Sequence, residues 1–275
     1  MPKILDQAVK AEDIEIGLED YFLRVLLTGG SGSGKTTSAL SLPGRKLLID
    51  IDGRKNAAAG FKNVRIIDLA KILKSDPKSP QAWLTLMKIK DELWQETRGD
   101  FPYNGVIADG LAAMNRMAIN WALLLDPSRG LGGTPAKQHW FPAMEAIVNF
   151  MKALLALPCH VILTSHIELI KDETTGGLRL TPKAIGKLRT EVEGWFDETY
   201  LCHREHGKGG KPNYYWTTAG GGKELFLKST LNHLGEYWED PIELSVPKDT
   251  SGATPWGFQR LLEKRFGKEK KETKS

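Results

Sequence analysis

The sequence has 275 residues, of which 41% are hydrophobic and 26% charged, and its formal net charge is +4. This balance predicts a globular chain with a buried core, and the mild positive charge permits a polyanionic partner without requiring one. The apolar runs, such as residues 25–27 and 160–163, are too short to cross a bilayer, and residues 1–22 lack the apolar core of a signal peptide, so we expect a cytoplasmic protein without membrane contact.

The first predicted element is a strand over residues 21–29, YFLRVLLTG. Its continuous apolar run suits a strand that is buried on both faces of a parallel sheet. A loop of glycines and serines follows, and residues 35–42 then have the composition of a helix that ends at Pro43. The order of strand, glycine loop and helix is the feature that carries chemistry.

This loop fits the pattern G-x-x-x-x-G-K-[ST]. Its backbone N–H groups and the start of the helix would hold phosphates, with Lys35 reaching the β- and γ-phosphates and Thr36 binding Mg²⁺. A glycine-rich turn with an incidental lysine is the alternative. We predict an ATP and Mg²⁺ site whose nucleotide-binding residues are Gly29, Gly30, Ser31, Gly32, Ser33, Gly34, Lys35, Thr36 and Thr37.

The next predicted strands cover residues 46–52 and 64–69, with a possible short helix between them. Asp50 and Asp52 close the first of these strands, and their spacing would place both carboxylates on one face. Asp52 is the candidate for the base, or for the residue that positions the attacking water. The alternative is that the acids only stabilise the turn in DIDGR.

A helix is predicted over residues 80–97, and a strand over residues 103–110, YNGVIADG. Asp109 ends this strand, where an acid could hold the hydrated Mg²⁺ together with Thr36. An acid at this place can also be an N-cap of the following helix. We predict Asp109 as the second metal-binding residue.

An irregular stretch over residues 126–138 precedes a helix at 139–157, and a buried strand is predicted at 160–166. His166 ends that strand, where it could contact the γ-phosphate as a sensor. Its neighbours Thr164 and Ser165 compete for this role, and a structural histidine is the plain alternative.

A second irregular region is predicted over residues 171–189, and from Trp195 onward the pattern favours antiparallel strands or hairpins. The two cysteines form no CxxC pair, so neither a disulfide framework nor a zinc ribbon is indicated. Cys202, His203 and His206 could in principle bind a metal, but the first two would point to opposite faces of a strand.

We therefore predict an α/β fold with a mostly parallel central sheet, flanking helices and β-hairpins toward the C-terminus. The expected organisation is an N-terminal extension at 1–19, an ATPase domain at 20–240, and a C-terminal extension with a helix and a charged tail at 241–275.

The order of these parts resembles the RecA-like P-loop ATPases over roughly residues 20–230. More narrowly, it resembles their bacteriophage branch, which is associated with single-strand annealing and recombination. The motifs that suggest the branch are HVILTSHIE, KDETTG, GKL and WFDE, which begin at residues 160, 171, 186 and 195. Two departures stand out, because related recombinases carry glutamate where this sequence has Asp52 and glutamine where it has His166.

The resemblance implies a homo-oligomer with ATP near the subunit interface, in the host cytoplasm if the chain is phage-encoded. Loops at 126–138 and 169–190 would line a path for single-stranded DNA, and a single-strand DNA-binding or annealing protein is a possible partner. Lys228 or Lys223 would reach the neighbour's nucleotide. The basic residues available in the two loops are Arg129, Lys137, Lys171, Arg179, Lys183, Lys187 and Arg189.

The leading functional hypothesis is a DNA-stimulated ATPase that assembles on single-stranded DNA in phage recombination, repair or replication. The first alternative is a P-loop kinase acting on a small molecule, although the only lid-like stretch, residues 183–190, is a poor match. The second is an assembly module that nucleotide binding regulates without significant turnover.

Overall fold

The computed structural model describes residues 21–76, 78–126, 128, 133–171, 176–207, 210–220, 227–231, 239–251 and 253–267. The predicted N-terminal extension at 1–19 lies outside these residues, as do Arg129 and Lys223. None of the helices in the described part combines the length and the apolar character that a bilayer crossing requires.

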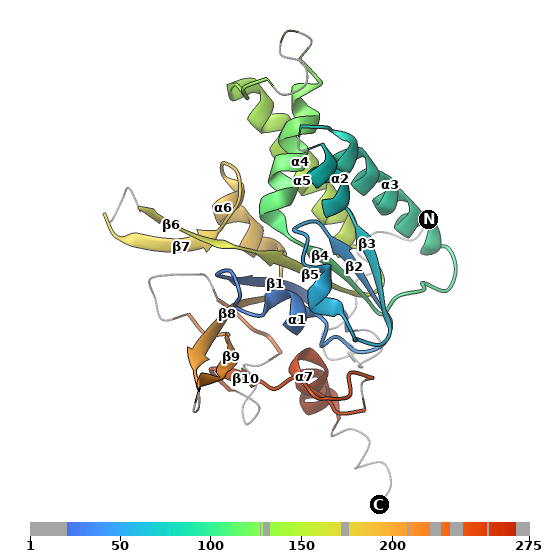
Figure 1. Cartoon of the computed structure of the whole chain (residues 1–275), viewed down its shortest axis with the longest axis vertical. Coiled ribbons are helices and arrows are strands. Elements are labelled where there is room, and N and C mark those ends of the chain that lie inside the picture. The colour runs from blue at the N-terminus through green and yellow to red at the C-terminus, as the bar shows by residue number, and fades with distance from the viewer. Residues whose placement is uncertain are drawn as a thin grey trace, which may run out of the picture.

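An eight-stranded sheet lies at the centre of the molecule, in the order β10-β9-β8-β1-β5-β4-β2-β3 (Figure 1). Neighbours from β8 to β3 pair in parallel, and β9 and β10 continue the sheet as antiparallel strands at one edge. The predicted fold is confirmed. The strands are β1 (Arg24–Gly29), β2 (Lys46–Asp50), β3 (Val64–Asp68), β4 (Gly105–Asp109), β5 (His160–Ser165), β8 (Glu198–His206), β9 (Pro212–Thr217) and β10 (Ile242–Leu244).

Helices cover both faces of this sheet (Figure 1). The strand β1 has apolar side chains on both faces of the sheet, and both faces are therefore covered. Leu26 packs into one apolar cluster, whereas Val25 and Leu27 pack into the other. The first cluster includes residues of α3, α4 and α5, and the second includes residues of α1 and α7. The helices are α1 (Lys35–Ala39), η3 (Lys55–Ala58), α2 (Ala70–Ser75), α3 (Gln81–Glu96), α4 (Leu111–Leu123), α5 (Lys137–Leu155), α6 (Leu188–Glu191), η4 (Val192–Trp195) and α7 (Gly257–Phe266).

The sequence suggested an irregular region over residues 171–189, but the described part of this region includes regular structure. The antiparallel pair of β6 (Ile167–Lys171) and β7 (Leu178–Pro182) forms a sheet of its own that extends from the body of the molecule (Figure 1). Leu169 pairs with Leu180. Apolar and polar residues alternate over residues 178–181 of β7, whereas Leu169 and Ile170 are adjacent apolar residues in β6. The strands are short and glycines lie close to them, so the sequence pattern favoured a loop.

The late strands differ in part from the antiparallel set that the sequence predicted. β8 runs parallel to β1 and antiparallel to β9, so it joins the two parts of the sheet. Buried Glu198 on β8 accepts hydrogen bonds from the backbone N–H groups of Thr230 (2.9 Å) and Leu231 (3.0 Å). These bonds attach the segment that carries Lys228, whose backbone bridges to Thr199.

His160, at the start of β5, gives the fold a pH dependence. Its Nδ1 accepts a hydrogen bond from the backbone N–H of Leu23 (3.0 Å), and burial lowers the pKa of the imidazole to about 4, with a smaller contribution from the charge of Arg24. As pH falls below about 6.5, the unfolded chain takes up a proton that the folded chain resists. The free energy of unfolding should therefore fall by about 2 kcal/mol between pH 7.5 and pH 5 from this group alone.

Urea unfolding of the wild type and His160→Asn at both pH values measures this contribution. The asparagine retains an acceptor for the Leu23 N–H but does not titrate, so the variant should lose less stability on acidification than the wild type. Equal losses in the two proteins would show that His160 does not carry the effect.

Candidate nucleotide-binding site

The glycine loop connects β1 to α1 and forms one side of a pocket of about 320 Å³. A side chain at Gly29 would overlap the carbonyl oxygen of Cys202, and a Cβ at Gly34 would lie 3.0 Å from the Tyr214 ring. Gly34 also has a φ of +86°, which favours glycine. Ser31, Gly32 and Ser33 line the pocket between these positions, and Thr37 lines it from α1.

Lys35 lies at the inner side of this loop and is only 8% exposed. Its Nζ donates hydrogen bonds to the carbonyl oxygens of Gly29 (2.8 Å) and Gly30 (2.7 Å). Burial lowers the pKa of the ammonium, and the negative charges of Asp109 and Asp52 oppose that shift. A phosphate group held by the loop would therefore lie next to a largely desolvated cation, where electrostatic attraction is strong.

Asp109 lies opposite the loop at the end of β4, as predicted, and the structure brings it to Thr36. Thr36 Oγ1 donates a hydrogen bond to Asp109 Oδ2 (2.7 Å), and the Thr164 hydroxyl donates to Oδ1. The N-cap of α4 is Gly110, without a side-chain capping bond, so Asp109 does not cap the helix. Burial raises the pKa of Asp109, and the hydrogen bonds from Thr164 and Thr36 partly offset that rise.

A carboxylate and a hydroxyl oxygen in contact are a donor set that fits Mg²⁺. Among the described residues, no group of three or more His, Cys, Asp or Glu side chains could hold a metal alone, and Cys202, His203 and His206 form no such group. A magnesium ion at Thr36 and Asp109 would therefore share its coordination between these two residues, water and phosphate oxygens.

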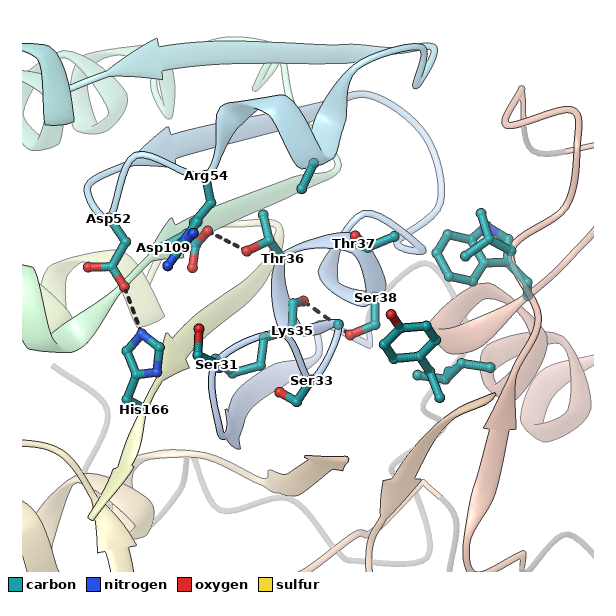
Figure 2. Close-up of a pocket in the computed structure, with 17 residues that line it drawn as sticks. Ser31, Ser33, Lys35, Thr36, Thr37, Ser38, Asp52, Arg54, Asp109 and His166 are labelled. Atoms are coloured by element: carbon teal, nitrogen blue, oxygen red, sulfur yellow. Dashed lines mark hydrogen bonds and ion pairs between the residues drawn. The ribbon is translucent and has the colours of Figure 1, made fainter. Parts of the chain in front are cut away.

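The two aspartates after β2 have different surroundings. Asp50 is buried, and its carboxylate oxygens accept hydrogen bonds from the backbone N–H groups of Arg54 (2.7 Å) and Lys55 (2.9 Å). This is the turn-stabilising role that the sequence left open for both acids. Asp52 instead lines the pocket, where its Oδ2 lies 3.6 Å from Nε2 of His166 (Figure 2).

His166, directly after β5, lines the pocket as the sequence analysis proposed. Burial lowers its pKa, the nearby charge of Lys35 lowers it further, and Asp52 opposes the change, so the site favours the neutral form of the imidazole. The two competing residues are engaged elsewhere: Thr164 bonds to Asp109, and the Ser165 hydroxyl donates to the carbonyl oxygen of His166 (2.8 Å).

Arg54 is a pocket residue that the sequence analysis missed. Figure 2 shows its side chain directed toward the region of Asp109 and Thr36, and its charge lowers the pKa of both Lys35 and His166. No ion pair within the described part of the chain engages its guanidinium. The DIDGRK stretch alone gave no signal for it, because its position depends on the turn that Asp50 holds.

Arg54→Ala should lower kcat about tenfold or more with a smaller effect on KM, because a guanidinium at this place would stabilise charge on the terminal phosphate. Steady-state phosphate release measures both constants. Arg54→Lys should recover part of the rate, and Arg65→Ala, which removes an arginine of the edge strand β3, serves as the control. A change in KM alone would mean that Arg54 only assists binding.

Lys228 is not among the residues that line this pocket. The resemblance assigned it to a neighbouring subunit's nucleotide, and that role stays a prediction. The pocket also includes a wall that the sequence did not indicate. Its residues, from late parts of the chain, are Tyr214, Leu244, Val246 and Trp256.

The comparison with protein families gives one match. Residues 22–225 match a family model described as an AAA domain, which is more than half of the 275 residues. The matched range contains the glycine loop, Asp52, Asp109 and His166, and it ends before β10 and α7. No curated protein matches the sequence.

Proposed function

The chain belongs to the AAA domain family of P-loop NTPases, and from this premise we propose that it hydrolyses ATP with Mg²⁺ and assembles on single-stranded DNA in phage recombination, repair or replication. The observation that carries the ATPase proposal is that three sets of polar side chains line the same pocket. These are Lys35 at the loop, Asp109 with Thr36, and Asp52 with His166.

Each group has a part in the proposed reaction. The loop amides and Lys35 bind the phosphates and offset their negative charge as the bond to the terminal phosphate breaks. Mg²⁺, when bound at Thr36 and Asp109, would neutralise phosphate oxygens. Asp52 accepts a hydrogen bond from the attacking water and orients it. His166, whose Nε2 lies 3.6 Å from Asp52 Oδ2, contacts the terminal phosphate as a sensor.

Asp52→Asn tests the hydrolysis step. We expect kcat to fall about 100-fold or more while ATP affinity changes little, because the amide cannot act as a base. Asp91→Asn, on the exposed surface of α3, is the matched control. A wild type that binds ATP and changes its assembly state without turnover would instead support the regulated assembly module, and phosphoryl transfer to small acceptors would support a kinase.

Two regions support the DNA proposal, and each lies in or next to one of the predicted loops at 126–138 and 169–190. Trp140 and Phe141 are exposed near the start of α5, three and four positions after Lys137. Aromatic side chains beside a cation suit stacked bases and their phosphates. In the second region, Lys171 ends β6 and Lys183 directly follows β7, so the two lysines lie at opposite ends of this strand pair.

Ion pairs reduce the number of basic side chains that would be available to DNA. Arg179 pairs with Glu193 (3.1 Å), and Arg189 pairs with Glu168 (2.9 Å). Lys187 also pairs with a glutamate, in the following turn of helix (3.4 Å). The proposal therefore rests on the lysines at 137, 171 and 183 rather than on the whole set that the sequence offered.

ATPase assays with and without single-stranded DNA test this part of the proposal. DNA should raise the rate, and the stimulation should weaken as salt increases, because phosphate contacts depend on counterion release. The double variant Lys137→Ala and Lys171→Ala should lose stimulation but keep the basal rate, whereas Lys90→Ala on α3 should keep both. If DNA neither binds at low salt nor changes the rate, this part of the proposal fails.

We also propose a homo-oligomer in which Lys228 contributes to the neighbour's nucleotide site, with a single-strand DNA-binding or annealing protein as a further partner. Light scattering with and without ATP tests the assembly. Lys228→Ala should then reduce turnover without changing nucleotide binding to the isolated subunit.

A further inference from the structure

The pocket has a polar side and an apolar side. Asp52 and His166 lie together on one side of the glycine loop, and Thr37 and Ser38 lie on the other (Figure 2). The apolar side is formed by Tyr214, Leu244, Val246 and Trp256. The phosphates of a nucleotide would bind on the polar side. The apolar side therefore suits a less polar part of the same ligand.

The strands β9 and β10 build the first half of this apolar wall. Tyr214 and Leu244 are direct partners across the antiparallel pair, so their side chains share a face of the sheet. The Tyr214 ring lies against Gly34, the glycine that precedes α1. The wall is therefore in contact with the loop that would hold the phosphates.

The segment around α7 builds the second half, and it is fixed to the helix that follows the loop. Trp256, immediately before α7, is only 7% exposed. The backbone N–H of Phe258 donates to Ser41 Oγ (2.9 Å), and the Phe258 ring lies 4.3 Å from that of Trp216. Trp216 in turn donates its indole N–H to Ser38 Oγ on α1 (3.2 Å). The wall is thus held in a fixed place relative to the loop.

We infer that Tyr214, Leu244, Val246 and Trp256 form the subsite for the planar heteroaromatic base of the nucleotide, and this rests on the proposed binding of its phosphates at the glycine loop. Aromatic side chains stack on bases, and an apolar wall favours burial of their faces. Leu244, Val246 and Trp256 lie beyond residue 225, where the family match ends, so the segment after the matched domain completes the nucleotide site.

Calorimetric titration with two magnesium complexes, ATP and inorganic tripolyphosphate, separates the base from the phosphates. For the wild type, ATP should bind about 10- to 100-fold more tightly than tripolyphosphate, because only ATP carries the base. Tyr214→Ala and Trp256→Ala should each weaken ATP about tenfold or more and leave tripolyphosphate affinity unchanged.

Two further variants at exposed positions keep the test decisive even if Trp256→Ala does not fold. Val246→Ser changes an exposed position of the wall and should also weaken ATP selectively, so a failure of Trp256→Ala to fold would not decide the result. Trp94→Ala removes an exposed tryptophan of α3 that is not among the residues lining the pocket, and it should change neither affinity.

The outcomes distinguish the two proposals. Equal affinity of the wild type for ATP and tripolyphosphate, or variants that weaken both ligands equally, would overturn the base subsite while leaving phosphate binding in place. If neither ligand binds the wild type, nucleotide binding at the loop fails, and the base subsite fails with it.

Discussion

Lys35→Ala is expected to weaken binding of Mg²⁺ and ATP about 100-fold or more and to reduce turnover to background. The ammonium is largely desolvated and is held by the carbonyl oxygens of Gly29 and Gly30, so it is placed for phosphate oxygens without further ordering. Alanine supplies no donor at this place, and the anionic ligand loses its nearest cation. Calorimetric titration and phosphate release measure the two effects.

Lys55→Ala is the matched control for this substitution. Lys55 lies one residue beyond Arg54, is exposed, and pairs with Asp68 (2.6 Å), and it is not among the residues lining the pocket. It should therefore retain binding and turnover. If Lys35→Ala bound ATP as tightly as Lys55→Ala does, the glycine loop would not be the phosphate site.

Asp109→Asn should change activity and stability in opposite directions. Magnesium-dependent turnover should fall about 100-fold or more, because an amide is a poor replacement for a carboxylate at Mg²⁺. At neutral pH the free energy of unfolding should rise in the absence of nucleotide. Burial raises the pKa of Asp109, which means that the folded chain disfavours the charge that the asparagine removes.

The sign of the stability effect can be checked by acidification. A carboxyl group whose pKa is raised on folding takes up its proton more readily in the folded chain, so lowering the pH relieves the wild type. The advantage of Asp109→Asn should therefore be largest near pH 7.5 and shrink as the pH falls through the folded pKa. Urea unfolding at several pH values measures it, and a variant that is less stable at pH 7.5 but normally active would contradict both expectations.

The order of elements along the chain predicted which residues meet at the polar side of the pocket. The strand, glycine loop and helix around Lys35 are local in sequence, and Asp109 ends a short apolar run that predicted a buried strand. Parallel strands bring their carboxyl ends to one edge of the sheet, which is why the sequence alone placed Asp52 and His166 near the loop.

The remaining parts of the pocket could not be predicted from the sequence. Arg54 depends on hydrogen bonds from a turn to Asp50, and the apolar wall depends on the pairing of β10 with β9. Tyr214 and Leu244 are thirty positions apart in the chain, and no period or motif links them. The β6 and β7 pair was missed because its strands are short and the stretch between them contains glycine.

The packing of α7 near α1 determines where this chain can be shortened. A fragment that ends with the family match, at residue 225, would uncover the Trp216 ring and leave the Ser41 hydroxyl without the Phe258 N–H. The neighbouring ring of Tyr200 would also lose its contact with Phe258. We therefore expect that the limit of sequence similarity is not a folding boundary, and that a stably folded fragment must retain α7.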